Sequence, residues 1–191
     1  MKNLFLIPAR GGSKGIPYKN IKIFGDKPLI IHSLEIARKL SDDSNICIST
    51  DDKKIISTVA KYNYTVPFIR PKELSTDEAT TYSVIKHAFN FYMVELKKKY
   101  DTVILLQPTS PIRKPNHITE ALQLFSKKID MVVSVCESDS NPYYNLYEEK
   151  NGFLFRSKKS PYTRRQDCPK VWQYNGSIYV INTQSLLKYN S

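Results

Sequence analysis

Short runs of apolar and β-branched residues alternate with helix-like stretches over the first two thirds of the chain. This alternation constrains the fold more than any other feature of the sequence. The strand-like runs are residues 3–9, 45–50, 66–70, 102–106 and 131–136, and the helix-like stretches are 28–40, 52–62, 80–99 and 115–127. The pattern predicts an α/β fold, in which helices cover both faces of a mostly parallel sheet.

The pattern changes after residue 137. Residues 141–155 contain three tyrosines and an Asn151-Gly152 pair between extended stretches, which is typical of a β-hairpin. A basic stretch follows, and the chain returns to a strand at 177–181 before a short helical end. We interpret residues 138–170 as an excursion from the sheet within a single domain, residues 1–191.

The composition predicts an anionic partner, because 29 Lys and Arg against 18 Asp and Glu give a net charge of +11. Charge alone does not distinguish nucleic acid, a phosphate-bearing small molecule and a solvated surface. No apolar run approaches the roughly 20 residues of a membrane helix. The cysteines, Cys47, Cys136 and Cys168, are widely spaced and form no metal-binding pattern. We therefore expect a cytoplasmic protein that contacts no membrane.

The loop at residues 8–20 directly follows the first predicted strand and combines glycines with positive charge. Glycines let the backbone approach a ligand, and cations attract phosphate groups. The spacing matches neither of the common motifs GxxxxGK[ST] and GxGxxG. A solvated basic turn is the alternative, but the position after a buried strand favours a polyphosphate site. The residues concerned are Gly11, Gly12, Gly15, Arg10, Lys14 and Lys19.

Three further strand ends carry polar residues, and ligands of open α/β sheets bind at such ends. Residues 49–52 could line a site, although we expect Thr50 or Asp51 to cap the next helix. Arg70 stands where another predicted strand ends. The proline-rich turn at 107–113 is expected to display its polar side chains, which are Gln107, Ser110 and Arg113.

Several of these segments together resemble the signature of the acylneuraminate cytidylyltransferases, also called CMP-sialic acid synthetases. The similarity is carried by residues 7–20 (IPARGGSKGIPYKN), 49–51 (STD), 70–74 (RPKEL), 106–113 (LQPTSPIR), 165–167 (RQD) and 175–179 (NGSIY). These motifs occur in the family's order and span almost the whole chain.

The resemblance implies a nucleotide-diphospho-sugar-transferase-like α/β fold and a reaction of CTP with a nine-carbon 2-keto sugar acid, giving a CMP-sugar and pyrophosphate. It places Lys19 and Arg10 at the reacting phosphate. It implies that CTP contacts Arg10, Ser13, Lys14, Asn20, Arg70 and Thr81, and that the sugar acid contacts Gln107, Arg165, Asn175 and Tyr179. It also implies a homodimer formed through the excursion, with no nucleic acid as partner.

The resemblance further implies a catalytic Mg²⁺, which members of the family hold with aspartates in a C-terminal segment. No Asp or Glu follows Asp167 in this sequence, so we expect that segment to be absent from residues 1–191 and assign no metal ligands. Asp51, Asp52 and Asp77 are possible substitutes. A lysine that some members place against the sugar carboxylate is missing near Tyr143 and Tyr144, which leaves the sugar open.

Three alternatives therefore stand beside the sialic acid reaction. The sugar acid could be legionaminic or pseudaminic acid. The chain could be a non-catalytic nucleotide-binding or dimerisation module of the same fold. A nucleic-acid-binding protein is the least favoured, because the basic residues lie on strand-end loops and not along one helix or stripe.

Overall fold

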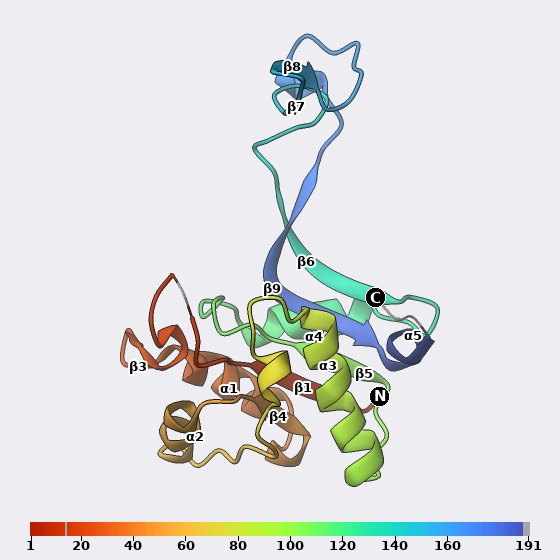
Figure 1. Ribbon diagram of the computed structural model, residues 1–191. Helices are drawn as coiled ribbons and strands as arrows, with labels where there is room; N and C mark the ends of the chain where they lie inside the picture. The colour runs from red at the N-terminus through yellow and green to blue at the C-terminus, as the bar shows by residue number, and fades with distance from the viewer. Residues whose placement is uncertain (14, 189–191) are drawn as a thin grey trace. The chain divides into compact units, whose positions relative to one another are not determined.

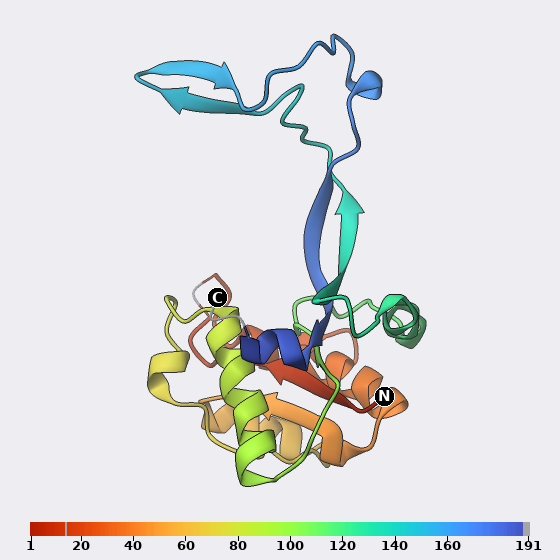
Figure 2. The same cartoon turned by 90° about the vertical axis from the view of Figure 1, so that its right-hand side faces the viewer.

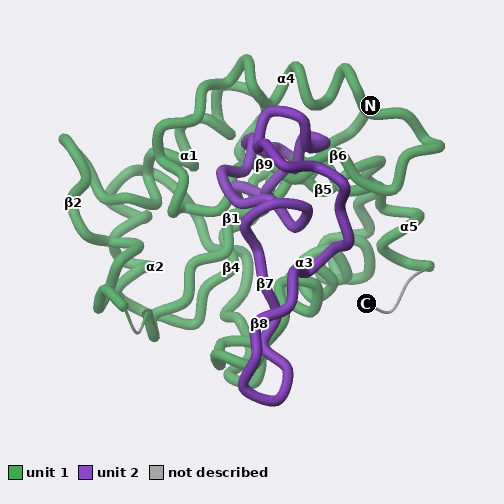
Figure 3. The backbone as a smooth tube through the Cα atoms, turned by 90° about the horizontal axis from the view of Figure 1, so that it is seen from above, with its two compact units in different colours: residues 1–133, 176–191 green, residues 134–175 purple. Residues whose placement is uncertain are grey.

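The computed structural model describes residues 1–13 and 15–188, which form two compact units (Figure 1). The first comprises residues 1–133 and 176–191, and the second comprises residues 134–175 (Figure 3). In the described ranges, no helix is long and apolar enough to cross a membrane.

A five-stranded sheet with the order β4-β1-β5-β9-β6 forms the centre of the first unit. β1 pairs in parallel with β4 and β5, so that Phe5 lies opposite both Ile46 and Ile104, while β9 is antiparallel to β5. The predicted mostly parallel sheet is therefore confirmed. Its strands are β1 (Asn3–Pro8), β4 (Ile46–Ser49), β5 (Thr102–Leu105), β6 (Met131–Glu137) and β9 (Trp172–Asn182).

Helices cover both faces of this sheet, as predicted (Figures 1 and 2). Alternate residues of β1 enter different cores, because successive side chains of a strand point to opposite faces. Phe5 packs with α1, α2 and α4, whereas Leu4 packs with α3 and α5. The helices are α1 (Leu29–Leu40), α2 (Lys53–Ala60), α3 (Thr81–Asn90), α4 (Pro115–Leu124) and α5 (Thr183–Lys188).

Shorter elements complete the first unit. β2 (Ile23–Phe24) and β3 (Lys27–Pro28) form a small antiparallel ribbon before α1. Single 3₁₀ turns occupy Lys19–Ile21, Asp43–Asn45 and Lys72–Leu74. A π-helical turn, Phe91–Glu95, continues α3.

The second unit contains the predicted hairpin. β7 (Tyr147–Lys150) and β8 (Phe153–Arg156) pair antiparallel around Asn151 and Gly152, both of which have positive φ (55° and 80°). Positive φ at both central residues is the requirement of a tight hairpin turn, and Asn-Gly meets it at little cost. A 3₁₀ turn, Arg165–Asp167, follows.

Two local predictions were wrong. Residues 66–70 form no strand but only one bridge, between Ile69 and Thr50, because Pro67 interrupts the run and cannot donate to a sheet. The long helix does not continue to Lys99. Its π-helical end stops at Glu95, and Lys97 takes a left-handed conformation with φ 51°.

Candidate functional site

A cavity of about 430 Å³ opens at the carboxyl ends of β1 and β5. Its walls come from three segments that lie far apart in the sequence, the loop after β1, the loop before α3 and the turn after β5. Of the residues that the resemblance assigned to CTP and the reacting phosphate, only Lys14 lies outside the described residues. The others line this cavity together with Gln107, and they are Arg10, Ser13, Lys19, Asn20, Arg70 and Thr81.

The loop after β1 is tied to the end of β4. The Gly11 backbone N–H donates to Asp51 Oδ1 (3.1 Å), and Asn20 Nδ2 donates to the Arg10 carbonyl (3.1 Å). A Cβ on Gly11 would lie 2.4 Å from Asp52 Oδ2, so only glycine permits this approach. These contacts set the course of the loop and therefore the positions of its cations.

Asp52, and not Thr50 or Asp51, caps α2. Its Oδ1 accepts hydrogen bonds from the Lys54 and Ile55 N–H groups (2.7 and 3.0 Å). The expected cap was wrong because the helix begins one residue later, at Lys53, which leaves Asp51 free to hold the Gly11 loop. Of these two neighbouring carboxylates, Asp52 thus caps a helix and Asp51 holds the loop after β1.

The chain immediately before Lys19 is held by a pair of side chains. Tyr18 has a positive φ of 53°, an uncommon conformation for a residue with a side chain. Lys54 Nζ lies 4.2 Å from the centre of the Tyr18 ring and donates to its hydroxyl (3.1 Å). The contact joins α2 to the turn that presents Lys19 to the cavity.

Arg10 is directed across the cavity to the loop before α3. Its Nη2 forms an ion pair with Asp77 Oδ1 (2.5 Å), and its Nη1 donates to the Thr76 carbonyl (2.8 Å). The sequence indicated Asp77 only as a possible metal substitute and gave no sign of this contact. In this structure a carboxylate therefore occupies the position that an anionic ligand of Arg10 would take.

Arg70 is a fixed cation in the cavity wall, with only 4% of its surface exposed. Its Nε donates to Ser49 Oγ (2.9 Å), and its Nη2 donates to the Ser49 carbonyl. Burial lowers the pKa of the Arg70 guanidinium, and the charge of Asp51 opposes that effect. The hydrogen bonds fix the guanidinium at the end of β4.

The turn after β5 carries Gln107, which reaches towards β9. A Cβ on Gly176 would lie 3.2 Å from Gln107 Oε1, and Gly176 has a φ of 71°, so a side chain there would be strained. A second cavity of about 330 Å³ shares Gln107 and Thr81 with the first and is also lined by Tyr179. Two of the four residues predicted to contact the sugar acid therefore lie at neighbouring cavities.

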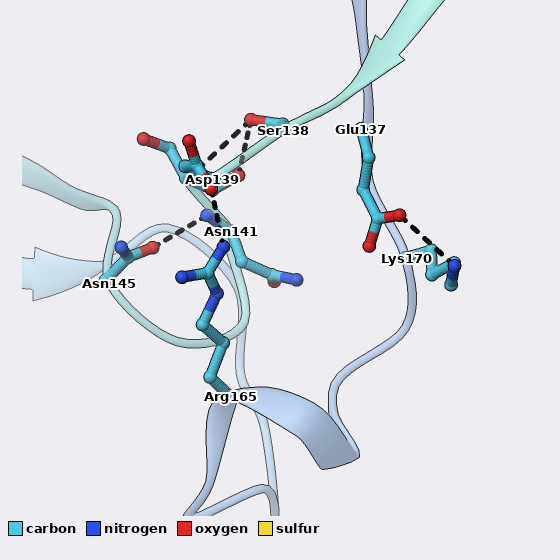
Figure 4. Close-up of polar contacts among 8 residues, drawn as sticks. Glu137, Ser138, Asp139, Asn141, Asn145, Arg165 and Lys170 are labelled. Carbon is cyan, nitrogen blue, oxygen red and sulfur yellow. Dashed lines mark hydrogen bonds and ion pairs between the residues drawn. The ribbon is translucent and has the colours of Figure 1, made fainter.

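The other two, Arg165 and Asn175, belong to the second unit. Arg165 Nη2 pairs with Asp139 Oδ1 (2.8 Å), as Figure 4 shows. Asn175 Oδ1 accepts a hydrogen bond from Ser134 Oγ (2.7 Å). Arg165 lines a cavity of about 420 Å³ within this unit.

Arg113 does not display its side chain, contrary to the expectation from the 107–113 turn. Only 7% of its surface is exposed, and its Nη2 donates to the Gln107 carbonyl. Burial lowers the pKa of Arg113 to about 10. The prediction failed because charged residues in turns are usually exposed, and nothing in the local pattern indicates a buried cation.

The expected Mg²⁺ stays a prediction, because Mg²⁺ is commonly held by only one or two carboxylates together with substrate phosphates. In the ranges 1–13 and 15–188, no three His, Cys, Asp or Glu side chains are arranged to hold a metal ion. Asp77 is the carboxylate that lines the cavity, and it is paired with Arg10. Asp51 and Asp52 are bonded to the Gly11 N–H and the α2 N-terminus.

A cavity of about 430 Å³ with cations in its wall, at the carboxyl ends of strands in a mostly parallel sheet, is typical of a nucleotide-binding α/β protein. The sequence model of the cytidylyltransferase family matches residues 4–186. The chain belongs to this family, whose members are nucleotidyltransferases.

Individual relatives agree with this assignment. The chain is 33% identical to the CMP-N,N'-diacetyllegionaminic acid synthase of Legionella pneumophila, covering 100% of this chain and 82% of the relative. It is 33% identical to the pseudaminic acid cytidylyltransferase of Campylobacter jejuni, covering 98% of this chain and 82% of the relative. It is also 33% identical to the N-acylneuraminate cytidylyltransferase of Streptococcus agalactiae, but spans only 46% of that longer protein.

The fold matches that of solved cytidylyltransferases. A structure of CMP:2-keto-3-deoxy-manno-octonic acid synthetase complexed with CTP superposes with a TM-score of 0.71 at 21% identity, covering 99% of this chain and 77% of the other. The predicted nucleotide-diphospho-sugar-transferase-like fold is thereby confirmed.

Proposed function

We propose that the protein joins CTP to a nine-carbon 2-keto sugar acid of the N-acylneuraminate or legionaminate type, releasing pyrophosphate. The observation that carries the proposal is the cavity in which Arg10, Lys19 and Arg70 meet. The relatives named for legionaminic, pseudaminic and N-acylneuraminic acids support the substrate class.

In the proposed reaction the anomeric hydroxyl of the sugar acid attacks the α-phosphorus of CTP. A new phosphorus–oxygen bond forms, the bond to the β-phosphate oxygen breaks, and pyrophosphate leaves with that electron pair. The hydroxyl proton is released to solvent. Such transfers need positioning and charge neutralisation more than a covalent nucleophile. We assign Lys19 and Arg10 to the charge that develops on the reacting phosphate.

The residues of the cavity walls suggest which side of the site binds CTP and which binds the sugar acid. We assign CTP to the side formed by the loop after β1 and by Arg70, with Ser13, Lys14, Asn20 and Thr81 as further contacts. We assign the sugar acid to Gln107 and Tyr179, where the two cavities adjoin. The resemblance implies Arg165 and Asn175 as further contacts of the sugar acid, and that assignment stays a prediction.

We also propose that the second unit forms a homodimer contact. The β7–β8 hairpin exposes Phe153 (70%), Leu154 (71%) and Phe155 (53%). Clustered exposed apolar residues are typical of an interaction surface.

Three free cysteines, Cys47, Cys136 and Cys168, fit the cytoplasmic location that we propose.

Pyrophosphate release tests the proposed reaction. Purified protein is supplied with CTP and Mg²⁺ and, in parallel, with sialic, legionaminic and pseudaminic acids. We expect turnover with at least one acid and its loss in Lys19→Ala. Lys22→Ala is the matched control, because Lys22 lies three residues further on and is exposed to solvent. CTP binding without pyrophosphate release for any of the acids would contradict the proposed reaction.

A further inference from the structure

Arg113 is a buried cation behind the wall of the cavity. Its Nη2 donates to the carbonyl of Gln107, and that carbonyl also accepts from the Ser110 N–H (3.2 Å). The turn after β5 is therefore closed on itself by two donors that meet at one oxygen. Because Gln107 lines both cavities, the guanidinium lies one residue away from the proposed substrates.

The remaining nitrogens of this guanidinium are not used for an ion pair. Arg113 Nε and Nη1 are buried and have no hydrogen-bond partner within residues 1–13 and 15–188, and no carboxylate of that part of the chain pairs with the side chain. Burying a charge without a counter-ion costs free energy, and a neutral residue of similar volume is often more stabilising. Arg113 is therefore not explained by a contribution to stability.

Gln107 is held through its backbone. Arg113 and the Ser110 N–H both donate to its carbonyl, while its Oε1 faces Gly176, which has no side chain to crowd it. The place of Gln107 where the two cavities adjoin therefore depends on the turn that Arg113 closes. A residue with this placement can discriminate between substrates only if its turn is rigid.

We propose that Arg113 is a positioning residue that fixes the Gln107 turn and thereby sets the affinity for the sugar acid, but not for CTP. This inference rests on the proposed function, because it takes Gln107 as a contact of the acidic substrate.

Steady-state kinetics of Arg113→Met, Arg113→Lys, Gln107→Ala and the double variant R113M/Q107A tests the inference. We expect Arg113→Met to raise the KM for the sugar acid roughly tenfold, because the variant loses a hydrogen bond from a charged donor. The KM for CTP should stay within about twofold, and Arg113→Lys should restore most of the loss because it retains a charged donor. In the Gln107→Ala background, Arg113→Met should raise the KM for the sugar acid by less than about twofold, since the effects of coupled residues are not additive.

An equal rise in the KM values for CTP and for the sugar acid would overturn the inference. So would a double variant whose KM for the sugar acid rises by the product of the two single-variant effects. Failure of Arg113→Met to fold leaves the test to Arg113→Lys, whose effect must then be confined to the sugar acid. The side-chain amide resonances of Gln107 provide a readout without turnover. They should shift in Arg113→Met and stay close to wild type in Arg113→Lys, and unchanged resonances in Arg113→Met would contradict a positioning role. If the wild type converts no sugar acid but these resonances do shift, the proposed function fails and the positioning of Gln107 survives.

Discussion

Arg10 and Asp77, which lie 67 residues apart in the sequence, form an ion pair of 2.5 Å across the mouth of the cavity. Arg10 is also one of the cations that we assign to the reacting phosphate. The Asp77 carboxylate therefore competes with an anionic substrate for the Arg10 guanidinium.

Replacing Asp77 by Asn should tighten CTP binding. The variant removes the carboxylate that competes for Arg10. Because a partly exposed ion pair contributes little free energy, its loss should lower the Kd for CTP by roughly two- to fivefold. Isothermal titration calorimetry with CTP measures the change. Glu78→Gln is the matched control, because it removes the same charge from an exposed neighbour in the same loop. Weaker CTP binding in Asp77→Asn would show that the carboxylate assists the nucleotide instead of competing with it.

Gly11 should not tolerate a side chain. In Gly11→Ala the new Cβ would meet the Asp52 carboxylate, which the α2 N-terminus holds in place, so we expect a loss of about 1–3 kcal/mol in the free energy of unfolding. CTP binding should weaken as well. Gly12→Ala is the control, since a Cβ there has nothing within 4 Å. Denaturant unfolding and CTP titration measure the stability and the CTP affinity of both variants. Equal values for Gly11→Ala and Gly12→Ala would contradict the contact between Gly11 and Asp52.

The pH dependence of stability should reflect Asp43. A hydrogen bond from Arg38, reinforced by its charge, lowers the pKa of Asp43 below its usual value of 3.8. A lowered pKa in the folded state adds stability that is present above the unfolded pKa and is lost as the pH falls through the folded pKa.

Wild type should therefore be more stable than Asp43→Asn at pH 6, and the difference should shrink below about pH 4. Thermal unfolding from pH 6 to pH 3 measures it, with Asp42→Asn as the exposed neighbouring control. A difference that grows towards low pH would have the wrong sign.

The exposed hairpin should determine the oligomeric state. We expect wild type to sediment as a dimer and F153S/F155S to shift towards monomer, because burial of these rings would supply the apolar area of the contact. Ile112→Ser serves as the control, since Ile112 is equally exposed (78%) but lies in the first unit. Sedimentation velocity over a range of concentrations distinguishes these outcomes. A monomeric wild type would refute the dimer proposal.

The sequence predicted the elements whose patterns are local. The apolar run of β1, the proline at the start of α4 and the Asn151-Gly152 turn each carry their structure within a few residues. The sequence also indicated most of the cavity wall, because strand ends in an α/β sheet converge on one edge.

The errors arose where distant contacts decide. Asp77 is paired through an interaction across 67 residues, which no local pattern displays. Arg113 is buried through the packing of the turn after β5, although charged residues in turns are commonly exposed. The cap of α2 is Asp52 and not the expected Thr50 or Asp51, because the helix begins one residue later, at Lys53, and Asp51 instead binds the distant Gly11 loop.

Phosphorus-31 NMR of the protein incubated with CTP and a sugar acid follows the proposed transfer at the phosphorus atoms themselves. We expect the CTP signals to be replaced by a phosphodiester signal of the CMP-sugar and by pyrophosphate in equal amounts, with no conversion in Lys19→Ala. Unchanged CTP with sialic, legionaminic and pseudaminic acids, or conversion to CDP and inorganic phosphate, would contradict it.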